Sequence, residues 1–215
     1  MKKKIYIIVA GGFGKEVAWI IECINKETPE WKIEGFLDDN EMLHGEVLNG
    51  YKVLGNCDLL SSVNEDIWVV CTIGTPCIRK RIINKIMTKS NIHFATIIAP
   101  TAIIPNTVII GEGTIIASGT ISSVNVTIGS HVIINMNCTI GHDTTILDFV
   151  TLRPSADIAG NILLEECVDV GIGAGILQNL NIKHDAVLGG GTVVVKNVKP
   201  YQIIVGIPGK PMIKK

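Results

Sequence analysis

The stretch Val126–Ile146 reads VTIGSHVIINMNCTIGHDTTI and carries a large aliphatic residue at almost every sixth position. The same step continues on both sides of this stretch, and sixteen of its seventeen positions are Ile, Leu or Val: Ile98, Ile104, Ile110, Ile116, Ser122, Ile128, Ile134, Ile140, Ile146, Leu152, Ile158, Leu164, Val170, Ile176, Ile182, Leu188 and Val194. Positions three residues out of phase, from Thr101 to Asn197, contain no Ile, Leu or Val. The aliphatic residues are therefore placed by a strict six-residue repeat.

A period of six fits neither a helix nor a flat strand alone, but it fits a short strand and a turn repeated as one side of a solenoid. The residue two positions before each aliphatic is mostly small or branched, as at Thr114, Val126 and Ala156. One large and one small inward residue per side can fill a narrow three-sided prism. We therefore predict a left-handed parallel β-helix of hexapeptide repeats, with coils stacked about 4.8 Å apart.

The residues before the repeat alternate between strand and helix patterns. Strands are predicted at 4–10, 31–37 and 67–72, and helices at 13–25 and 78–87. This alternation is typical of a small, parallel, Rossmann-like α/β sheet. We place a domain boundary near residue 95, with a nucleotide-sugar-binding domain at 1–95 and a β-helix domain with a C-terminal tail at 96–215.

Gly11, Gly12, Phe13 and Gly14 span the junction between the first predicted strand and the first helix. Bare N–H groups at a helix N-terminus can hold a phosphate, although tight packing of the helix on the strand explains such a turn about as well. Asp38-Asp39 ends the second predicted strand, from which a carboxylate can reach a ribose or base. Val9 replaces the first glycine of a dinucleotide fingerprint, so a mononucleotide or nucleotide sugar is favoured over NAD.

Composition argues against several classes of protein. The net charge is −1, and Lys2–Lys4 is the one basic cluster, so nucleic-acid binding has no electrostatic basis. The apolar run Ile5–Ala10 is too short for a signal peptide or a membrane span. The six cysteines are scattered without metal or redox spacing. We expect a cytoplasmic chain that neither inserts into a membrane nor holds a metal.

Among the five histidines, His142 is the candidate general base. The repeat turns Ile140 inward and His142 outward near a turn, and the adjacent Asp143 can fix the imidazole tautomer. His131 has no carboxylate beside it in the sequence. His184 precedes Asp185 but lacks the surrounding motif, so it is the weaker candidate.

The whole chain resembles the bacterial sugar O- and N-acetyltransferases that join a nucleotide-binding domain to a left-handed β-helix. This group includes sialic acid O-acetyltransferases and nucleotide-4-amino-sugar N-acetyltransferases. The matching stretches, in chain order, are Ala10–Val17, Gly35–Asp39, Ile73-Gly74 with Arg79, Gly141–Asp143, Leu188–Gly191 and Val205–Pro211.

The resemblance implies acetyl-CoA as co-substrate and a homotrimer with donor sites between subunits. It assigns His142 as catalytic base, Asp143 as its modulator and Gly160 as the N–H donor to the thioester carbonyl. The remaining implied contacts are Gly171, Ile172 and Gly190 to coenzyme A, Asn135 to the acceptor pocket, and Gly11, Gly12, Phe13, Asp38 and Asp39 to the acceptor nucleotide. Two departures from the family pattern are Val9 and the stretch Thr151–Ala156.

We predict direct N-acetylation of the 4-amino group of a UDP- or dTDP-linked 4-amino-4,6-dideoxy sugar in polysaccharide or glycan biosynthesis. An amine with a pKa of about 8, like an α-amino group, needs only a modest base. A covalent acyl-enzyme is not favoured, because no cysteine or serine has a base beside it in the sequence. The alternatives are O-acetylation of a sugar such as sialic acid and, less favoured, a non-catalytic hexapeptide-repeat protein.

Overall fold

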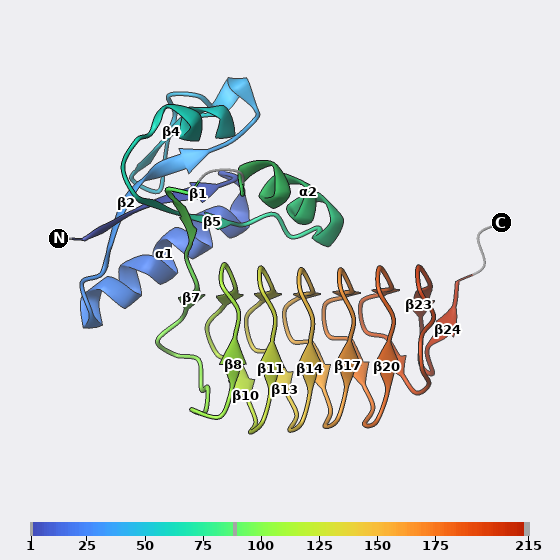
Figure 1. Ribbon diagram of the computed structural model, residues 1–215. Coiled ribbons are helices and arrows are strands. Elements are labelled where there is room, and N and C mark those ends of the chain that lie inside the picture. The colour runs from blue at the N-terminus through green and yellow to red at the C-terminus, as the bar shows by residue number, and fades with distance from the viewer. Residues whose placement is uncertain (1, 88–89, 213–215) are drawn as a thin grey trace. The chain divides into compact units, whose positions relative to one another are not determined.

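A computed structural model describes residues 2–87 and 90–212 of the protein (Figure 1). The chain divides into two compact units. One holds the chain up to Gly74 together with Ile78–Pro100, and the other holds Thr75–Cys77 and the chain from Thr101 onward. Each unit has its own core.

The first unit is built on a sheet with the strand order β3-β4-β2-β1-β5-β6. Its elements are β1 (Lys3–Ile8), α1 (Gly12–Glu27), β2 (Trp31–Leu37), the 3₁₀ turn η1 (Glu41–Leu43), β3 (Val47–Leu48), β4 (Tyr51–Gly55), the 3₁₀ turn η2 (Cys57–Ser62), β5 (Ile67–Cys71), α2 (Pro76–Ile86), β6 (Ile92–Phe94) and β7 (Ile97–Ile98). The predicted strand–helix alternation around β1, β2 and β5 is confirmed, and β1 pairs in parallel with both β2 and β5.

The sheet is mixed rather than wholly parallel, because β3 and β4 form an antiparallel hairpin. Asn49 and Gly50 turn the chain between them with φ values of 49° and 85°. Two consecutive positive φ values are typical of a tight hairpin turn, and Asn-Gly is its usual sequence. The hairpin extends the sheet beyond the strands predicted from hydrophobic runs.

Helix α1 packs on the sheet through Val17, Ala18, Ile20 and Ile21, all of which are buried. At its start, a side chain on Gly14 would overlap the carbonyl oxygen of Val9. Glycine is therefore needed where the helix leaves the first strand, which places the helix N-terminus at the end of β1.

The second unit is a stack of coils with three flat faces, the left-handed parallel β-helix that the repeat predicts (Figure 1). The first face, here called face A, consists of β10 (Ile121–Ser122), β13 (Thr139–Ile140), β16 (Asp157–Ile158), β19 (Gly175–Ile176) and β22 (Val193–Val194). Face B consists of β8 (Ile109–Ile110), β11 (Thr127–Ile128), β14 (Thr145–Ile146), β17 (Leu163–Leu164) and β20 (Asn181–Ile182). Face C contains β9 (Ile115–Ile116), β12 (Ile133–Ile134), β15 (Thr151–Leu152), β18 (Asp169–Val170), β21 (Val187–Leu188), β23 (Ile203–Val205) and β24 (Lys210–Pro211).

The strands of each face pair in parallel one coil apart, as Ile128 does with Ile146, which lies 18 residues further on, except that β24 pairs antiparallel with β23. From Ile116 to Val194, every residue on the six-residue step is buried. The out-of-phase residues from Gly113 to Gly191 all have positive φ values, so they form the corners. The hexapeptide period thus fixes both the core and the turns.

No helix within the described ranges combines the length and the hydrophobicity that a membrane span requires.

Candidate active site

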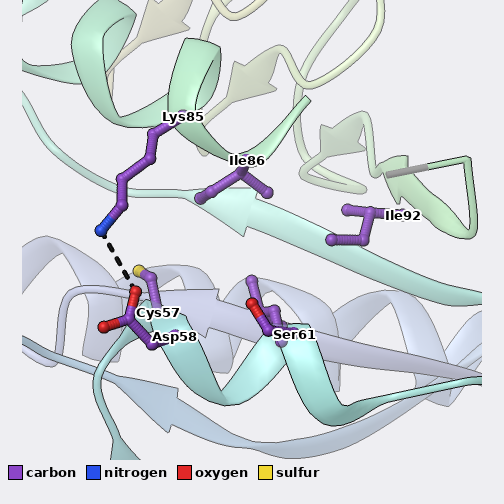
Figure 2. Close-up of a pocket in the computed structure, with 7 residues that line it drawn as sticks. Cys57, Asp58, Ser61, Lys85, Ile86 and Ile92 are labelled. Atoms are coloured by element: carbon purple, nitrogen blue, oxygen red, sulfur yellow. Dashed lines mark hydrogen bonds and ion pairs between the residues drawn. The ribbon is translucent and has the colours of Figure 1, made fainter. Parts of the chain in front are cut away.

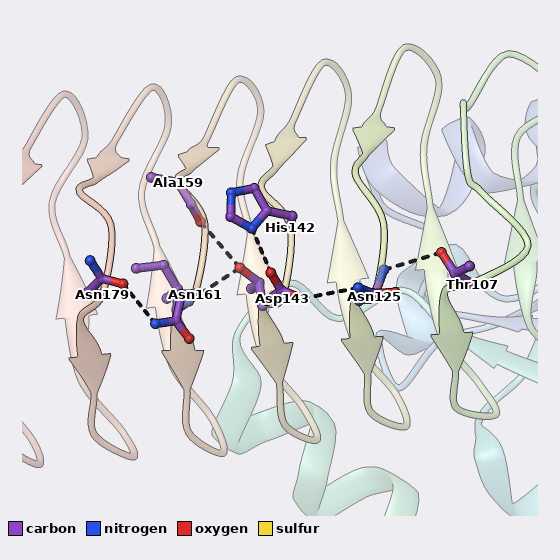
Figure 3. A network of polar contacts seen from close by, with 9 residues as sticks. Thr107, Asn125, His142, Asp143, Ala159, Asn161 and Asn179 are labelled. Atoms are coloured by element: carbon purple, nitrogen blue, oxygen red, sulfur yellow. Dashed lines mark hydrogen bonds and ion pairs between the residues drawn. The ribbon is translucent and has the colours of Figure 1, made fainter.

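His142 lies at the corner between faces A and B, and its side chain is 63% exposed. Its Nδ1 is 2.8 Å from Oδ2 of Asp143 (Figure 3). A carboxylate can only accept, so Nδ1 carries the proton in this pair and Nε2 keeps its lone pair. This tautomer leaves Nε2 able to take a proton from a substrate.

Asp143 is held by a second contact that the sequence analysis did not identify. The side-chain amide of Asn125 donates to its Oδ1 at 3.2 Å. The hydrogen bond from His142 and then that from Asn125 lower the pKa of Asp143, so the carboxylate is ionised at neutral pH. Asn125 stands one coil before Asp143 in the same corner column, and the 18-residue spacing is the signal that could have found it.

Gly160 lies one coil beyond His142, against the imidazole ring. A Cβ at Gly160 would come within 2.7 Å of Nε2 of His142. The absence of a side chain is therefore required for the observed ring position. In the described part of the chain, the N–H of Gly160 has no acceptor, so a basic nitrogen and a free backbone donor are close together at this corner.

His184 and Asp185 form a pair of nearly the same geometry at the corner between faces B and C. Nδ1 of His184 lies 2.9 Å from Oδ2 of Asp185. The His184 ring packs edge-on against Tyr201, with ring centroids 5.1 Å apart. His131 is different again, because it is buried and stacked on Phe149. Pair geometry alone therefore does not separate His142 from His184.

Three residues assigned to coenzyme A by resemblance lie together at the corner between faces C and A. Gly171, Ile172 and Gly190 line a groove of about 310 Å³. A Cβ at Gly171 would lie 2.6 Å from the nitrogen of Gly190, which shows how closely successive coils stack there. Three glycines, Gly171, Gly189 and Gly190, therefore leave backbone bare in this groove, beside the side chains of Ile172 and Val187.

Asn135 belongs to the same corner, two coils before Gly171, whereas His142 and Gly160 lie at the other edge of face A. Within one chain, the strands β10, β13, β16, β19 and β22 separate these two groups. A single prism therefore brings Gly171, Ile172 and Gly190 together but leaves His142 apart from them.

In the first unit, Asp38 and Asp39 line a cavity of about 90 Å³ together with Val9 and Ile73. The Asp38 carboxylate accepts from the N–H groups of Ala10 and Asn40, each at 2.9 Å, so it is occupied by its own loop. The Asp39 side chain is exposed and has no hydrogen-bond partner among residues 2–87 and 90–212. Of the two carboxylates, Asp39 is the one available to a ligand.

Val9 has φ 78°, which is unfavourable for a β-branched residue. Its N–H donates to Leu37 at 2.7 Å, and its carbonyl accepts from the Thr72 hydroxyl at 3.1 Å. These bonds hold Val9 in a conformation that glycine adopts without strain. The departure from the family pattern thus occurs at a position whose backbone is still that of a glycine.

Gly11, Gly12 and Phe13 begin helix α1, with Gly11 as its N-cap and no side-chain capping bond. The first N–H groups of a helix have no intrahelical acceptor, so they can bind an anion. These residues and the Asp38-Asp39 cavity both adjoin the end of β1, consistent with a shared site.

A second cavity of the first unit, shown in Figure 2, is lined by Cys57, Asp58, Ser61, Lys85 and Ile92 among others. Lys85 closes one side of it through an ion pair with Asp58 at 3.1 Å. Burial raises the pKa of Cys57 to about 12, so its thiol is protonated at neutral pH and is a poor nucleophile.

Comparison with known proteins identifies both units. The profile of the PglD N-terminal domain matches residues 4–86. GDP-perosamine N-acetyltransferase of Escherichia coli O157:H7 is 31% identical over 176 residues, covering 81% of this chain and 78% of that protein. The acetyltransferase domain of PglB from Neisseria gonorrhoeae FA1090, in complex with acetyl coenzyme A, has a TM-score of 0.90 and 28% identity, covering 99% of this chain and all of that one (100%). WeeI from Acinetobacter baumannii AYE has a TM-score of 0.87 and 30% identity, covering 98% and 100%.

The hexapeptide-repeat fold and these relatives define a hexapeptide-repeat acyltransferase with an added α/β unit. The chain belongs to the bacterial sugar acetyltransferases that carry a PglD-type N-terminal domain. It is an acetyl-CoA-dependent acetyltransferase of that family.

Proposed function

We propose that this enzyme N-acetylates the 4-amino group of a UDP- or dTDP-linked 4-amino-4,6-dideoxy sugar. The observation that carries the proposal is the His142 corner, where a lone pair on Nε2 faces the backbone of Gly160. An amine acceptor is supported by the E. coli relative, which is an N-acetyltransferase of a GDP-linked sugar.

In the proposed reaction, the acceptor amine attacks the thioester carbonyl carbon of acetyl-CoA. His142 Nε2 takes the amine proton, and Asp143 stabilises the imidazolium that forms. The Gly160 N–H donates to the developing oxyanion. The C–S bond then breaks, the acetyl group stays on nitrogen, and the coenzyme A thiolate takes up a proton.

The acceptor nucleotide is proposed to bind in the first unit, with its phosphates at Gly11, Gly12 and Phe13. Asp39 reaches the ribose or base, because the Asp38 carboxylate is already engaged by Ala10 and Asn40. Asp38 then acts indirectly, because its carboxylate holds the backbone at Ala10 and Asn40 in place.

Asp39→Asn is expected to raise the acceptor KM by about tenfold and to leave kcat nearly unchanged, because it removes binding shared by ground state and transition state. The measurement is steady-state acetylation of UDP-, dTDP- and GDP-linked 4-amino sugars. Asp66→Asn is the matched control, since Asp66 is an exposed carboxylate of the same unit. Efficient acetylation of free sialic acid, with no turnover of any nucleotide-linked amine, would contradict the proposal and favour O-acetylation.

The donor site is proposed to lie between two subunits of a homotrimer. Support comes from the position of His142 and Gly160 at one edge of face A and of Gly171, Ile172 and Gly190 at the other. Two neighbouring prisms can bring opposite edges together, whereas one prism has no deep cleft to do so.

Mixing His142→Ala subunits with Gly190→Phe subunits is therefore expected to restore part of the activity that each variant lacks alone. A Cβ at Gly190 would lie 3.3 Å from the carbonyl oxygen of Ile172, a tight contact that a small shift of that carbonyl would relieve, so the fold should tolerate the side chain while the groove is filled. Activity is measured on mixed trimers separated by two affinity tags. Mixed trimers that stay inactive would indicate sites built within one chain.

We place the enzyme in the cytoplasm. All six cysteines are free, including the buried Cys71, Cys138 and Cys167, and free thiols are typical of a reducing compartment. Cell fractionation is the direct measurement, and recovery outside the soluble cytoplasmic fraction would contradict this location.

A further inference from the structure

We propose that Arg153, held by Asp169, binds a carbonyl oxygen of the pantetheine arm of acetyl-CoA and so fixes the donor in the groove. This inference rests on the proposed function. It concerns the stretch Thr151–Ala156, where the sequence departs from the family pattern.

Arg153 is fixed by a bidentate ion pair. Its Nε donates to Oδ1 of Asp169 at 2.9 Å, and its Nη2 donates to Oδ2 at 2.7 Å. The Asp169 side chain is only 13% exposed, whereas that of Arg153 is 38% exposed. The paired carboxylate raises the pKa of Arg153, so the guanidinium is charged and its orientation is set.

The third nitrogen of the guanidinium is left available. Nη1 of Arg153 has no hydrogen-bond partner in the described portion of the chain. Arg153 and Asp169 line the same 310 Å³ groove as Gly171, Ile172 and Gly190. A hydrogen-bond donor with a fixed direction thus lines a groove in which three glycines leave backbone bare.

The position of Arg153 along the prism places it near the reacting end of the donor. It lies one coil beyond Asn135 and one coil before Gly171 in the same corner column, as the bonds from Asn135 N to Leu152 O and from Arg153 N to Val170 O show. It also belongs to the same coil as Gly160, the proposed oxyanion donor. Subunits related by a threefold axis parallel to the prism would hold Arg153 and the neighbouring Gly160 at the same level.

The ion pair also selects the chemistry of the ligand. Asp169 neutralises the guanidinium and would repel a phosphate placed beside it. A neutral carbonyl oxygen can accept from Nη1 without disturbing the pair, and the pantetheine arm has two amide carbonyls near its thioester end. Arg153 is therefore matched to the arm rather than to the phosphates of coenzyme A.

The test compares Arg153→Met with wild-type enzyme, using acetyl-CoA and acetyl-pantetheine as donors. Methionine keeps an unbranched stem but removes the donor nitrogens. We expect kcat/KM to fall by about 10- to 100-fold with both donors, the usual effect of losing a hydrogen bond from a charged group. The matched control is Lys183→Met, because Lys183 forms a 2.7 Å ion pair with Glu165 on the surface of the same β-helix. It should leave kcat/KM unchanged.

If Arg153→Met lowered kcat/KM with acetyl-CoA but not with acetyl-pantetheine, the contact of Arg153 would be with a phosphate of coenzyme A. That result would overturn the inference. Unchanged kcat/KM for Arg153→Met with both donors would also overturn it, while wild-type activity on a nucleotide-linked amine would still support the proposed function. Asp169→Asn adds a second readout. The amide oxygen of the new side chain still accepts a hydrogen bond from Arg153, but the charge of the Arg153 guanidinium is no longer neutralised. The variant should therefore have a salt-dependent KM for acetyl-CoA that wild-type enzyme lacks. A salt response of KM equal to that of wild type would show that Asp169 is not the group that neutralises the Arg153 guanidinium.

Discussion

Replacing His142 with alanine is expected to lower turnover by about 10²- to 10⁴-fold, which is the usual contribution of a positioned general base. The fold should be unaffected, because the His142 side chain is 63% exposed and its imidazole lies against the bare backbone of Gly160. The measurement is kcat with saturating acetyl-CoA and acceptor, accompanied by a thermal melt.

The chain offers a closely matched control for this experiment. His184 has the same Nδ1 contact to a following aspartate, at 2.9 Å rather than 2.8 Å. Removing its imidazole should leave turnover nearly unchanged, because its ring packs against Tyr201 rather than beside a free backbone donor. Near-normal turnover of His142→Ala together with loss of activity in His184→Ala would reverse the assignment of the base.

The second large effect concerns stability. Ile146→Asp is expected to reduce the free energy of unfolding by more than about 4 kcal/mol, because it leaves an unpaired carboxylate in a dry core. Ile146 is fully buried at the centre of face B, in strand β14. A loss of this size is comparable to the whole stability of many domains, so the variant should be largely unfolded or insoluble.

The control introduces the same residue at a corner. Asn179 is exposed, has φ 63°, and accepts from the side-chain amide of Asn161 at 2.7 Å through an oxygen that aspartate retains. Asn179→Asp should therefore shift the melting temperature very little. Ile146→Val gives a graded third point, with an expected loss of about 0.5–1.5 kcal/mol. Equal melting temperatures for Ile146→Asp and Asn179→Asp would show that the inward register is wrong.

The β-helix could be predicted in detail because its information is local. Each hexapeptide repeats the same inward aliphatic and the same corner, so one register accounts for Ile116 through Val194. The first coil is less enclosed, and Ile104 and Ile110 are only half-buried. In the first unit the long apolar strands were predictable, whereas the hairpin β3–β4 was missed because its strands are short and partly exposed. The Asn49-Gly50 pair is the signal that could have revealed it.

The sequence by itself determined the six-residue period, the three-sided prism, the candidate His142–Asp143 pair and the glycine turn before helix α1. Tertiary structure alone decided which groups are free to act. It places Gly160 against His142, engages the Asp38 carboxylate with Ala10 and Asn40, and joins Arg153 to Asp169 across one coil. The physical reason is that a repeat fixes backbone positions through local hydrophobic periodicity. The partner of a polar side chain depends instead on which residues the coiling of the chain brings within hydrogen-bond distance.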